Sequence, residues 1–339
     1  MKTPKARKLP SGSWFVRVMV NGESVSITKP TEKEAVAEAM ALKAGVKAAR
    51  MNPSSVSLRA AIDDYINLRE TVLSPATIRG YRAIQKNRFP TIIDKPINSI
   101  SDADFQRAIN AEAKRYCAKT LYNSWGFIAS VLRESAGREV NVRLPQVIKE
   151  EREFLQPDEI FAFMDAIRGT KHEAALLLGL HGLRASEILA LRWGSIDLTE
   201  NVIRVHGAAV LDSNNKLVQK KENKNATSRR LVPILIPRLA ELAGAQRQNP
   251  GDLIFQASCS APLYRASVRA SRRADLPIVG VHGLRHSFAS LCYHRGVPEA
   301  VTMKLGGWSD PGTVRKIYTH VADIDLRRQA ENLAAFFQP

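Results

Sequence analysis

The chain has 339 residues, more than one compact core usually needs, so its length favours two or three domains. Its 50 Lys and Arg residues against 33 Asp and Glu residues give a net charge of +17. This charge favours a polyanionic partner, because each phosphate contact releases condensed counterions. A membrane partner is disfavoured, since the sequence has no apolar run of about 18 residues and no basic amphipathic anchor. The alternative is a basic protein whose charges are simply solvated.

Cysteine usage points to a reducing compartment. Cys117, Cys259 and Cys292 lie far apart and are odd in number, which supports neither a disulfide framework nor a zinc cluster. The N-terminal residues lack the apolar stretch of a signal peptide, and the carboxylates do not cluster as two-metal chemistry requires. We therefore expect a cytoplasmic, nucleic-acid-binding protein that uses no cofactor and no metal.

Residues 1–50 predict a small sheet-plus-helix module. Residues 14–20 form a short β-rich run, Asn21-Gly22 is the strongest two-residue hairpin signal, and residues 24–28 alternate as a return strand. Residues 31–50 are rich in alanine, with acidic residues early and basic residues late, as helix ends prefer. The module is too small for a catalytic core, but a strand ribbon of this size can fit a major groove.

Residues 56–140 predict a four-helix domain. Ser74 is followed by proline as an N-cap is at a helix start, Ser101 and Asp104 resemble a capping box, and residues 119–136 form the last helix. The first helix carries an apolar stripe at Leu58, Ile62, Tyr65 and Ile66. By pattern alone this could be any helical bundle, and its many Lys and Arg residues favour DNA.

Residues 142–153 are polar and make a natural linker to a third domain at 150–339. Helices are expected to start within 155–159, at 173–183 and 185–191, and from 237 onward, with strand-like runs at 202–206, 217–221 and 230–235. The predicted fold class is therefore α+β and mainly helical, with a mixed α/β domain at the C-terminal end. A last apolar stripe predicts a terminal helix over 323–339, which could dock on its own domain or on a neighbouring protomer.

Four patterns in this half carry polar chemistry. The first is Arg184 at a helix start with Glu187 three residues on, which places both on one face. The second is a basic turn that contains Lys224 and runs into a strand, which we expect to be a hairpin loop. Because Lys216, Lys220 and Lys221 are close in sequence, the choice of lysine stays open.

The third pattern is His282 with Arg285, three residues apart, so both can point into one cleft. The fourth is Leu-Gly-Gly followed by Trp308, and then Tyr318 ten residues later. Taken singly, these patterns have ordinary explanations: a surface ion pair, a cationic loop, a satisfied histidine and a packed tyrosine.

Together and in this order, the four patterns resemble the tyrosine recombinase (phage integrase) family. GLRASEILAL, HGLRHSF and LGGWSDPGTVRKIYTH are similar to the family's three main boxes. The segment WFVRVMVNGESVSI looks like the arm-type DNA-binding domain of integrases, and residues 56–140 look like their core-binding domain. One departure is Trp308, which stands where many members carry histidine. An indole N–H can donate a hydrogen bond, but it cannot transfer a proton.

The resemblance implies cleavage and rejoining of DNA through a 3′-phosphotyrosyl bond to Tyr318, without metal or ATP. Arg184 and Arg285 would stabilise the charge that gathers on the attacked phosphate. His282 is the expected base and Lys224 the expected acid for the leaving 5′-oxygen. Glu187 would support its neighbours by hydrogen bonding. If Tyr318 were not the nucleophile, Tyr293 would be the next candidate.

The same resemblance implies double-stranded attachment-site DNA as the partner and a tetramer assembled on it, which would integrate or excise a prophage or other mobile element. The expected location is the cytoplasm, on the nucleoid of a bacterial host. The sequence leaves open whether DNA-bending or directionality factors take part. Two rival functions are a type IB topoisomerase, disfavoured by the arm-like module, and a catalytically silent DNA-binding regulator, disfavoured by the complete set of chemical groups.

Overall fold

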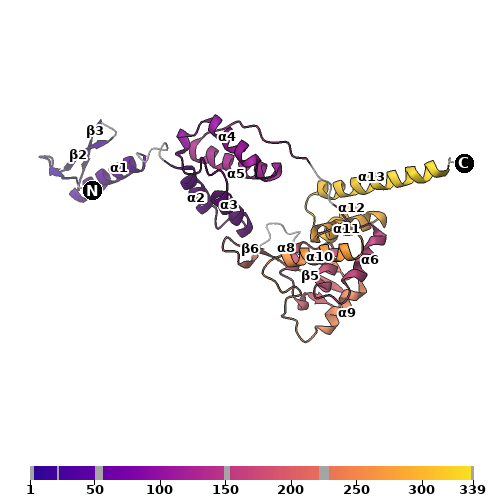
Figure 1. The fold of residues 1–339 in the computed structure, drawn as a ribbon. Coiled ribbons are helices and arrows are strands. Elements are labelled where there is room, and N and C mark those ends of the chain that lie inside the picture. The colour runs from indigo at the N-terminus through magenta and orange to yellow at the C-terminus, as the bar shows by residue number, and fades with distance from the viewer. Residues whose placement is uncertain (1–3, 21–22, 50–55, 149–152, 221–228, 337–339) are drawn as a thin grey trace. The chain divides into compact units, whose positions relative to one another are not determined.

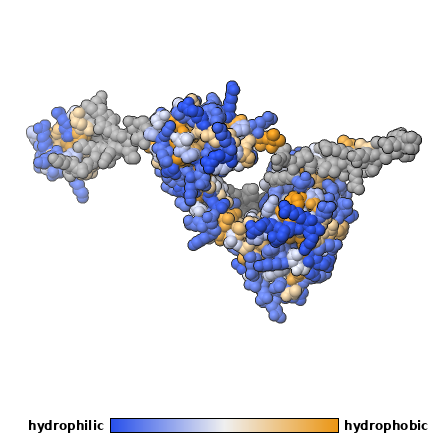
Figure 2. Space-filling view, viewed as in Figure 1, coloured by the Kyte–Doolittle hydropathy of each residue, from blue (hydrophilic) through white to orange (hydrophobic). Residues whose placement is uncertain are grey.

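The computed structural model describes residues 4–20, 23–49, 56–148, 153–220 and 229–336 (Figure 1). Contacts divide the chain into two units, one of residues 1–69 with 81–148 and the other of residues 70–80 with 149–339. None of the helices in the described ranges is long and apolar enough to cross a bilayer. The visible surface is mostly hydrophilic, with apolar residues scattered over it (Figure 2), as expected where apolar side chains are packed into cores.

The N-terminal module is a three-stranded antiparallel sheet against one helix. Its elements are β1 (Arg7–Lys8), β2 (Trp14–Val20), β3 (Glu23–Lys29) and α1 (Glu32–Ala49), in sheet order β1-β2-β3. Val16, Val18 and Ile27 alternate onto the buried face and pack against Ala35 and Ala39 of the helix. The predicted strands and helix are confirmed, while β1 was missed. Asn21-Gly22, the predicted turn, lies outside the described residues.

The predicted four helices of the next segment are confirmed. They are α2 (Leu58–Asn67), α3 (Pro75–Asn87), α4 (Asp102–Ala113) and α5 (Ala118–Ala136), with a 3₁₀ turn η2 (Ile97–Ser99) before α4. Ser101 Oγ accepts from the Asp104 N–H at 3.2 Å and the Asp104 carboxylate accepts from the Ser101 N–H at 3.0 Å, so the capping box is present. Ser74 caps α3 by accepting from the Thr77 N–H.

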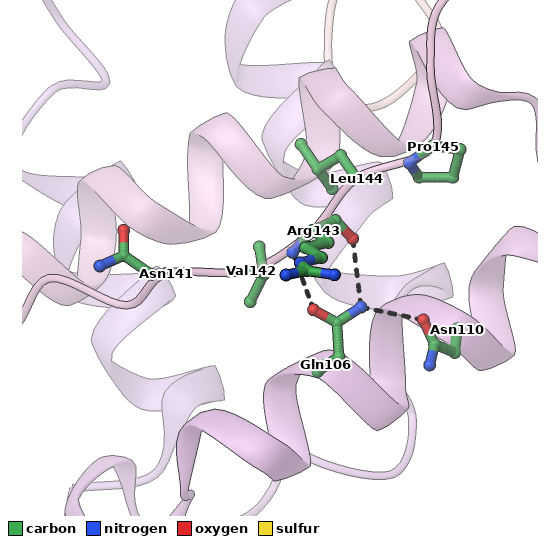
Figure 3. Close-up of a pocket in the computed structure, with 7 residues that line it drawn as sticks. All are labelled: Gln106, Asn110, Asn141, Val142, Arg143, Leu144 and Pro145. Atoms are coloured by element: carbon green, nitrogen blue, oxygen red, sulfur yellow. Dashed lines mark hydrogen bonds between the residues drawn. The ribbon is translucent and has the colours of Figure 1, made fainter.

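The first part of the predicted linker is held to the helical unit by one side chain. Gln106 of α4 accepts from the Arg143 N–H at 2.8 Å and donates to the Arg143 carbonyl at 3.1 Å (Figure 3). Both backbone groups of residue 143 are thereby satisfied as they would be in a sheet ladder. Residues 139–148 have no regular secondary structure, as the linker prediction requires. Residues 149–152 lie outside the described ranges.

The C-terminal unit is mainly helical and contains two small antiparallel sheets. Its helices are α6 (Pro157–Ile167), α7 (Glu173–Leu180), α8 (Ala185–Ile188), α9 (Pro237–Ala245), α10 (Ala261–Arg273), α11 (Val281–His294), α12 (Glu299–Gly306) and α13 (Pro311–Phe336), with a 3₁₀ turn η3 (Trp193–Ser195). Its strands are β4 (Ile196–Asp197), β5 (Val202–Val205), β6 (Ala208–Leu211), β7 (Leu217–Lys220) and β8 (Arg230–Pro233). The predicted fold class, α+β and mainly helical, is confirmed, although β4 and β6 were missed.

Three local predictions need correction. The helix expected over 185–191 ends at Ile188, because the chain then turns toward η3. The helix expected over 323–339 is the last part of α13, which begins at Pro311 and continues without a break to Phe336. Strand β7 pairs with β6, and β8 pairs with β5, so among the described residues the strands on either side of residue 224 belong to different sheets. The basic turn therefore does not connect the two arms of one hairpin.

Helix α11 joins two apolar clusters of this unit. Its N-terminal half, with Val281 and Leu284, belongs to the large core around α7 and β5. Its C-terminal half, with Phe288 and Cys292, packs against α12 and the first turns of α13. Arg285 lies between these two halves, where the two clusters meet.

Candidate active site

Arg184 stands at the N-cap of α8 in an extended conformation. Its backbone N–H donates to Glu187 Oε2 at 2.8 Å, and its Nη1 donates to Glu187 Oε1 at 2.9 Å. Its Nη2 donates to the carbonyl of Gly307 at 2.5 Å. The predicted i, i+3 pair is therefore present, and the arginine is also bound to a segment 123 residues away. About 39% of its side chain is exposed, so it can reach a ligand.

A second arginine, which the sequence analysis missed, binds the same carboxylate. Arg230 begins β8, and its Nη1 and Nη2 donate to the two oxygens of Glu187 at 3.0 Å each. Its Nε donates to the carbonyl of Leu305 at 2.8 Å. This bidentate pair is buried, with 7% of the Arg230 side chain and 4% of the Glu187 side chain exposed.

Arg285 is buried in the first half of α11, with 1% of the residue exposed. Its Nη1 donates to the carbonyls of Gly182 and Gly306. Its Nη2 is buried and has no hydrogen-bond partner among the described residues. Burial, followed by the charge of nearby Arg184, lowers the pKa of Arg285. The guanidinium still carries its charge at neutral pH, because arginine starts from a pKa above 12.

The three arginines bind three successive carbonyls. Arg230, Arg285 and Arg184 donate to Leu305, Gly306 and Gly307 respectively. We call these three side chains the arginine cluster. The carbonyls face the cluster at the end of α12, where Gly307 adopts φ +69° as a left-handed C-cap.

Glycine at positions 306 and 307 has steric causes as well. A Cβ on Gly306 would overlap the indole ring of Trp308, and a Cβ on Gly307 would lie 2.8 Å from Arg230 Nη1. The backbone of the Leu-Gly-Gly-Trp motif thus supplies the carbonyls to which the arginine cluster binds.

Trp308 packs beneath Arg285. The Arg285 Cζ atom lies 3.9 Å from the centroid of the Trp308 ring, and 7% of the tryptophan is exposed. The negative face of the indole stabilises a cation that has lost its water. The structure therefore brings Arg184, Glu187, Arg285 and Trp308 of the predicted set together, with Arg230 added.

Tyr318 lies in the second turn of α13 and is half-buried. Its hydroxyl donates to Thr302 Oγ1 of α12 at 2.8 Å. Burial raises the pKa of Tyr318, and the hydrogen bond with Thr302 partly opposes that rise. Tyr293, the alternative nucleophile, packs edge-on against it, with 5.3 Å between ring centroids. The phenol is thus bound to a neighbouring helix, separate from the contacts of the arginine cluster.

His282 is exposed in the first turn of α11, edge-on to His286 at 4.7 Å between ring centroids. An exposed imidazole next to the arginine-bearing turn is accessible to a ligand. Lys224 lies outside the described residues, as does Lys221. Of the other candidates, Lys220 ends β7, where it pairs with Ala208, and Lys216 lies in the turn between β6 and β7.

The electrostatics of the cluster leave a net positive charge. Burial alone would raise the pKa of Glu187, but the hydrogen bonds and charge of Arg230, and then those of Arg184, lower it below its ordinary value. The carboxylate is therefore ionised at neutral pH and offsets one of three guanidinium groups. An anion would find fixed donors here, together with the unpartnered Nη2 of Arg285.

Comparison with known proteins shows the family to which the sequence belongs. The sequence model of the phage integrase family matches residues 153–324. The XerC-like tyrosine recombinase of Caldanaerobacter subterraneus is 28% identical over 218 residues, which span 56% of this chain and 56% of that relative's length.

Two solved structures show the same fold. The Tn1549 transposon integrase in complex with transposon right end DNA superposes with a TM-score of 0.64 and 17% identity, covering 81% of this chain and all of that one. A lambda integrase tetramer bound to a Holliday junction gives a TM-score of 0.53 and 17% identity, covering 91% and 96% of the two chains. The family match covers half of this chain and contains every residue of the arginine cluster together with Tyr318. The protein belongs to the phage integrase family of tyrosine recombinases.

Proposed function

We propose that this protein is a site-specific DNA recombinase that cuts and rejoins DNA through a covalent bond to Tyr318. The observation that carries the proposal is the arginine cluster, in which fixed guanidinium groups are held on three successive carbonyls. The buried, unpartnered Nη2 of Arg285 supports an anionic ligand at this place. A DNA phosphodiester is the ligand that suits a chain of net charge +17.

In the proposed reaction, the cluster stabilises the transition state. Attack on the phosphodiester gathers negative charge on the two nonbridging oxygens of five-coordinate phosphorus. Arg184 and Arg285 would donate to these oxygens, and because they are already fixed they need little reorganisation. Trp308 would hold Arg285 from below.

Tyr318 is the proposed nucleophile. The phenolic oxygen forms a bond to phosphorus, the 5′-oxygen of the DNA leaves, and a 3′-phosphotyrosyl ester remains. His282 would take the phenolic proton, and Lys224 would give a proton to the leaving 5′-oxygen. Attack by a 5′-hydroxyl on the ester reverses these bond changes, so rejoining needs no ATP.

The proposed partners are double-stranded attachment sites and further copies of the chain. The mobile-element role rests on the relatives, among them a transposon integrase bound to transposon end DNA. A tetramer on DNA rests on the lambda integrase complex with a Holliday junction. We further propose three modules: residues 1–50 as an arm-type DNA-binding module, 56–140 as the core-binding domain, and 150–339 as the catalytic domain.

The test is covalent trapping. The protein is incubated with nicked duplexes from the flanks of its gene, denatured in detergent, and the attached DNA is sequenced, which gives the site and the cleavage position together. We expect Tyr318→Phe to abolish the covalent complex and to leave DNA binding intact. Tyr293→Phe, which removes the neighbouring phenol, is the matched control and should still form the complex. A covalent adduct from Tyr318→Phe would overturn the nucleophile assignment, and relaxation of plasmids without any preferred site would favour a topoisomerase.

A further inference from the structure

Arg230 is a buried charge beside the site, with 7% of its side chain exposed, that the proposed mechanism does not use. It comes from β8, whereas Glu187 comes from α8 and Leu305 from α12. Its three guanidinium nitrogens all donate to protein, two to Glu187 and one to Leu305. Arg285, by contrast, has its Nη2 without a hydrogen-bond partner among the described residues, whereas each guanidinium nitrogen of Arg230 is already bound. A direct contact with substrate is therefore not its role.

Arg230 stabilises the ionised carboxylate of Glu187 more than Arg184 does. A carboxylate with 4% of its side chain exposed is costly to keep ionised without partners. Arg230 gives it two hydrogen bonds from the guanidinium, whereas Arg184 gives one from its guanidinium and one from its backbone. The effect of Arg230 is also the largest of those that lower the pKa of Glu187.

The charges facing Glu187 come from three elements: Arg184 at the N-cap of α8, Arg230 on β8 and Arg285 on α11. With Glu187 ionised, the four groups sum to a charge of two. If Arg230 were neutral, the sum would fall to one, and Glu187 would have Arg184 as its remaining hydrogen-bonded cation. Glu187, which holds Arg184 by hydrogen bonds, would then offset the positive charge that Arg184 offers to a phosphate.

We propose that Arg230 is a positioning residue that neutralises Glu187, so that Glu187 can hold Arg184 in place without cancelling its charge. This inference rests on the proposed recombinase function. It also accounts for the second bond of Arg230, to the Leu305 carbonyl, which fixes the start of the Leu305–Gly307 segment to which Arg184 and Arg285 bind.

The test compares variants that separate charge from geometry. Arg230→Gln removes the charge, Arg230→Lys keeps it without the bidentate fork, and Arg230→Gln with Glu187→Gln removes the cation and the carboxylate together. Arg204→Gln is the matched control, because Arg204 lies on neighbouring β5, pairs with Asp197, and is 40% exposed. The measurements are the single-turnover rate of covalent complex formation on the mapped site, the DNA affinity and the melting temperature.

We expect Arg230→Gln to slow cleavage about 100-fold, because Glu187 would then offset the charge of Arg184, a proposed transition-state donor. DNA affinity should change by less than about threefold. The double variant should cleave at least about fivefold faster than Arg230→Gln, because the uncompensated carboxylate is gone. Arg230→Lys should stay within about tenfold of the wild type, since a point charge still offsets Glu187. A purely structural role would lower the melting temperature but would not produce this recovery.

Two results would overturn the inference: Arg230→Gln cleaving at the wild-type rate, or a double variant that cleaves no faster than Arg230→Gln. If Arg230→Gln does not fold, Arg230→Lys decides, and a loss as large as about 100-fold in a folded lysine variant contradicts a charge role. Failure of the proposed function has a different signature. In that case the wild type and Arg204→Gln would form no covalent complex on any DNA.

Discussion

The two sides of the candidate site are held in different ways. On one side, each member of the arginine cluster is bound to a backbone carbonyl, and two of them share a buried carboxylate. On the other side, Tyr318 is held through its hydroxyl by Thr302. The cations are fixed before any ligand arrives, whereas Tyr318, the proposed nucleophile, is attached by a bond that can be exchanged.

The difference is the one that the proposed reaction requires of each side. Charge stabilisation is most effective when the donors need no rearrangement as charge develops. A nucleophile has to leave its resting hydrogen bond, approach phosphorus and later release it. One hydrogen bond, worth about 1 kcal/mol net, holds such a group without trapping it. The predictions below test this contrast, beginning with the largest effect.

Replacing Arg285 should have the largest effect. Arg285→Met keeps much of the side-chain volume but leaves the carbonyls of Gly182 and Gly306 without their donor and removes the buried cation. We expect covalent complex formation to fall about 10³-fold, as when a preorganised donor is lost, together with a lower melting temperature. Arg265→Met, which removes an exposed arginine of α10, should leave the melting temperature unchanged. If a folded Arg285→Met protein cleaved within about tenfold of the wild-type rate, the arginine cluster would have no major role in catalysis.

What the sequence could reveal depended on the distance between partners along the chain. The Arg184–Glu187 pair was predicted because three residues place both on one helical face. Arg230 was missed because its partners, Glu187 and Leu305, are 43 and 75 residues away. Only the folded chain brings β8 to α8 and α12, and a second arginine in a basic turn gives no local signal of burial.

The same reasoning explains the other differences. The four helices of 56–140 were predicted well because their signals are local, such as the capping box of Ser101 and Asp104 and the apolar stripe of α2. The sheet partners of β7 and β8 were not, because strand pairing is decided by burial of residues such as Val232 against β5. The binding of Tyr318 to Thr302 joins two helices, and no spacing rule predicts it.

Gly306→Ala should disturb the arginine cluster by changing the backbone segment to which the cluster binds. The added methyl would overlap the indole of Trp308, which would have to move away from Arg285. We expect a loss of about 3 kcal/mol in the free energy of unfolding, within the range for overpacked cores, measured by denaturant titration. Gly244→Ala is the control, because its Cβ would meet only Leu198 Cδ1 at 3.9 Å. In helix α9 it should stabilise by about 0.5–1 kcal/mol. Equal stability of Gly306→Ala and the wild type would contradict the close approach.

A fixed histidine on the arginine side gives a pH test. His181, next to Gly182, is fully buried: its Nδ1 donates to the Leu177 carbonyl, and its Nε2 accepts from the Leu235 N–H at 3.0 Å. Burial lowers the pKa of His181 to about 4. In the unfolded chain His181 has a pKa of about 6.5 and takes up a proton below that pH, whereas in the folded protein it stays neutral down to about pH 4. The free energy of unfolding therefore falls as the pH drops through this window.

Between pH 7 and pH 5 the difference in the pKa of His181 should lower the free energy of unfolding by about 2 kcal/mol. The measurement is the free energy of unfolding of wild type and His181→Gln at both values. The variant should lose about 2 kcal/mol less than the wild type over this interval, whatever its starting stability. Parallel losses would mean that folding does not lower the pKa of His181.

The smallest effect tests the nucleophile side. Thr302→Val keeps the shape of the buried residue but removes the oxygen that accepts from Tyr318. If the phenol has to leave this bond before it attacks, the variant should form covalent complex up to about fivefold faster, the equivalent of about 1 kcal/mol. The comparison is made under single-turnover conditions at saturating protein. Thr319→Val, on the exposed face of α13 beside Tyr318, is the control and should keep the wild-type rate. A rate several-fold below the wild type would mean that Thr302 holds Tyr318 ready for attack, and the nucleophile would then be as firmly fixed as the arginines.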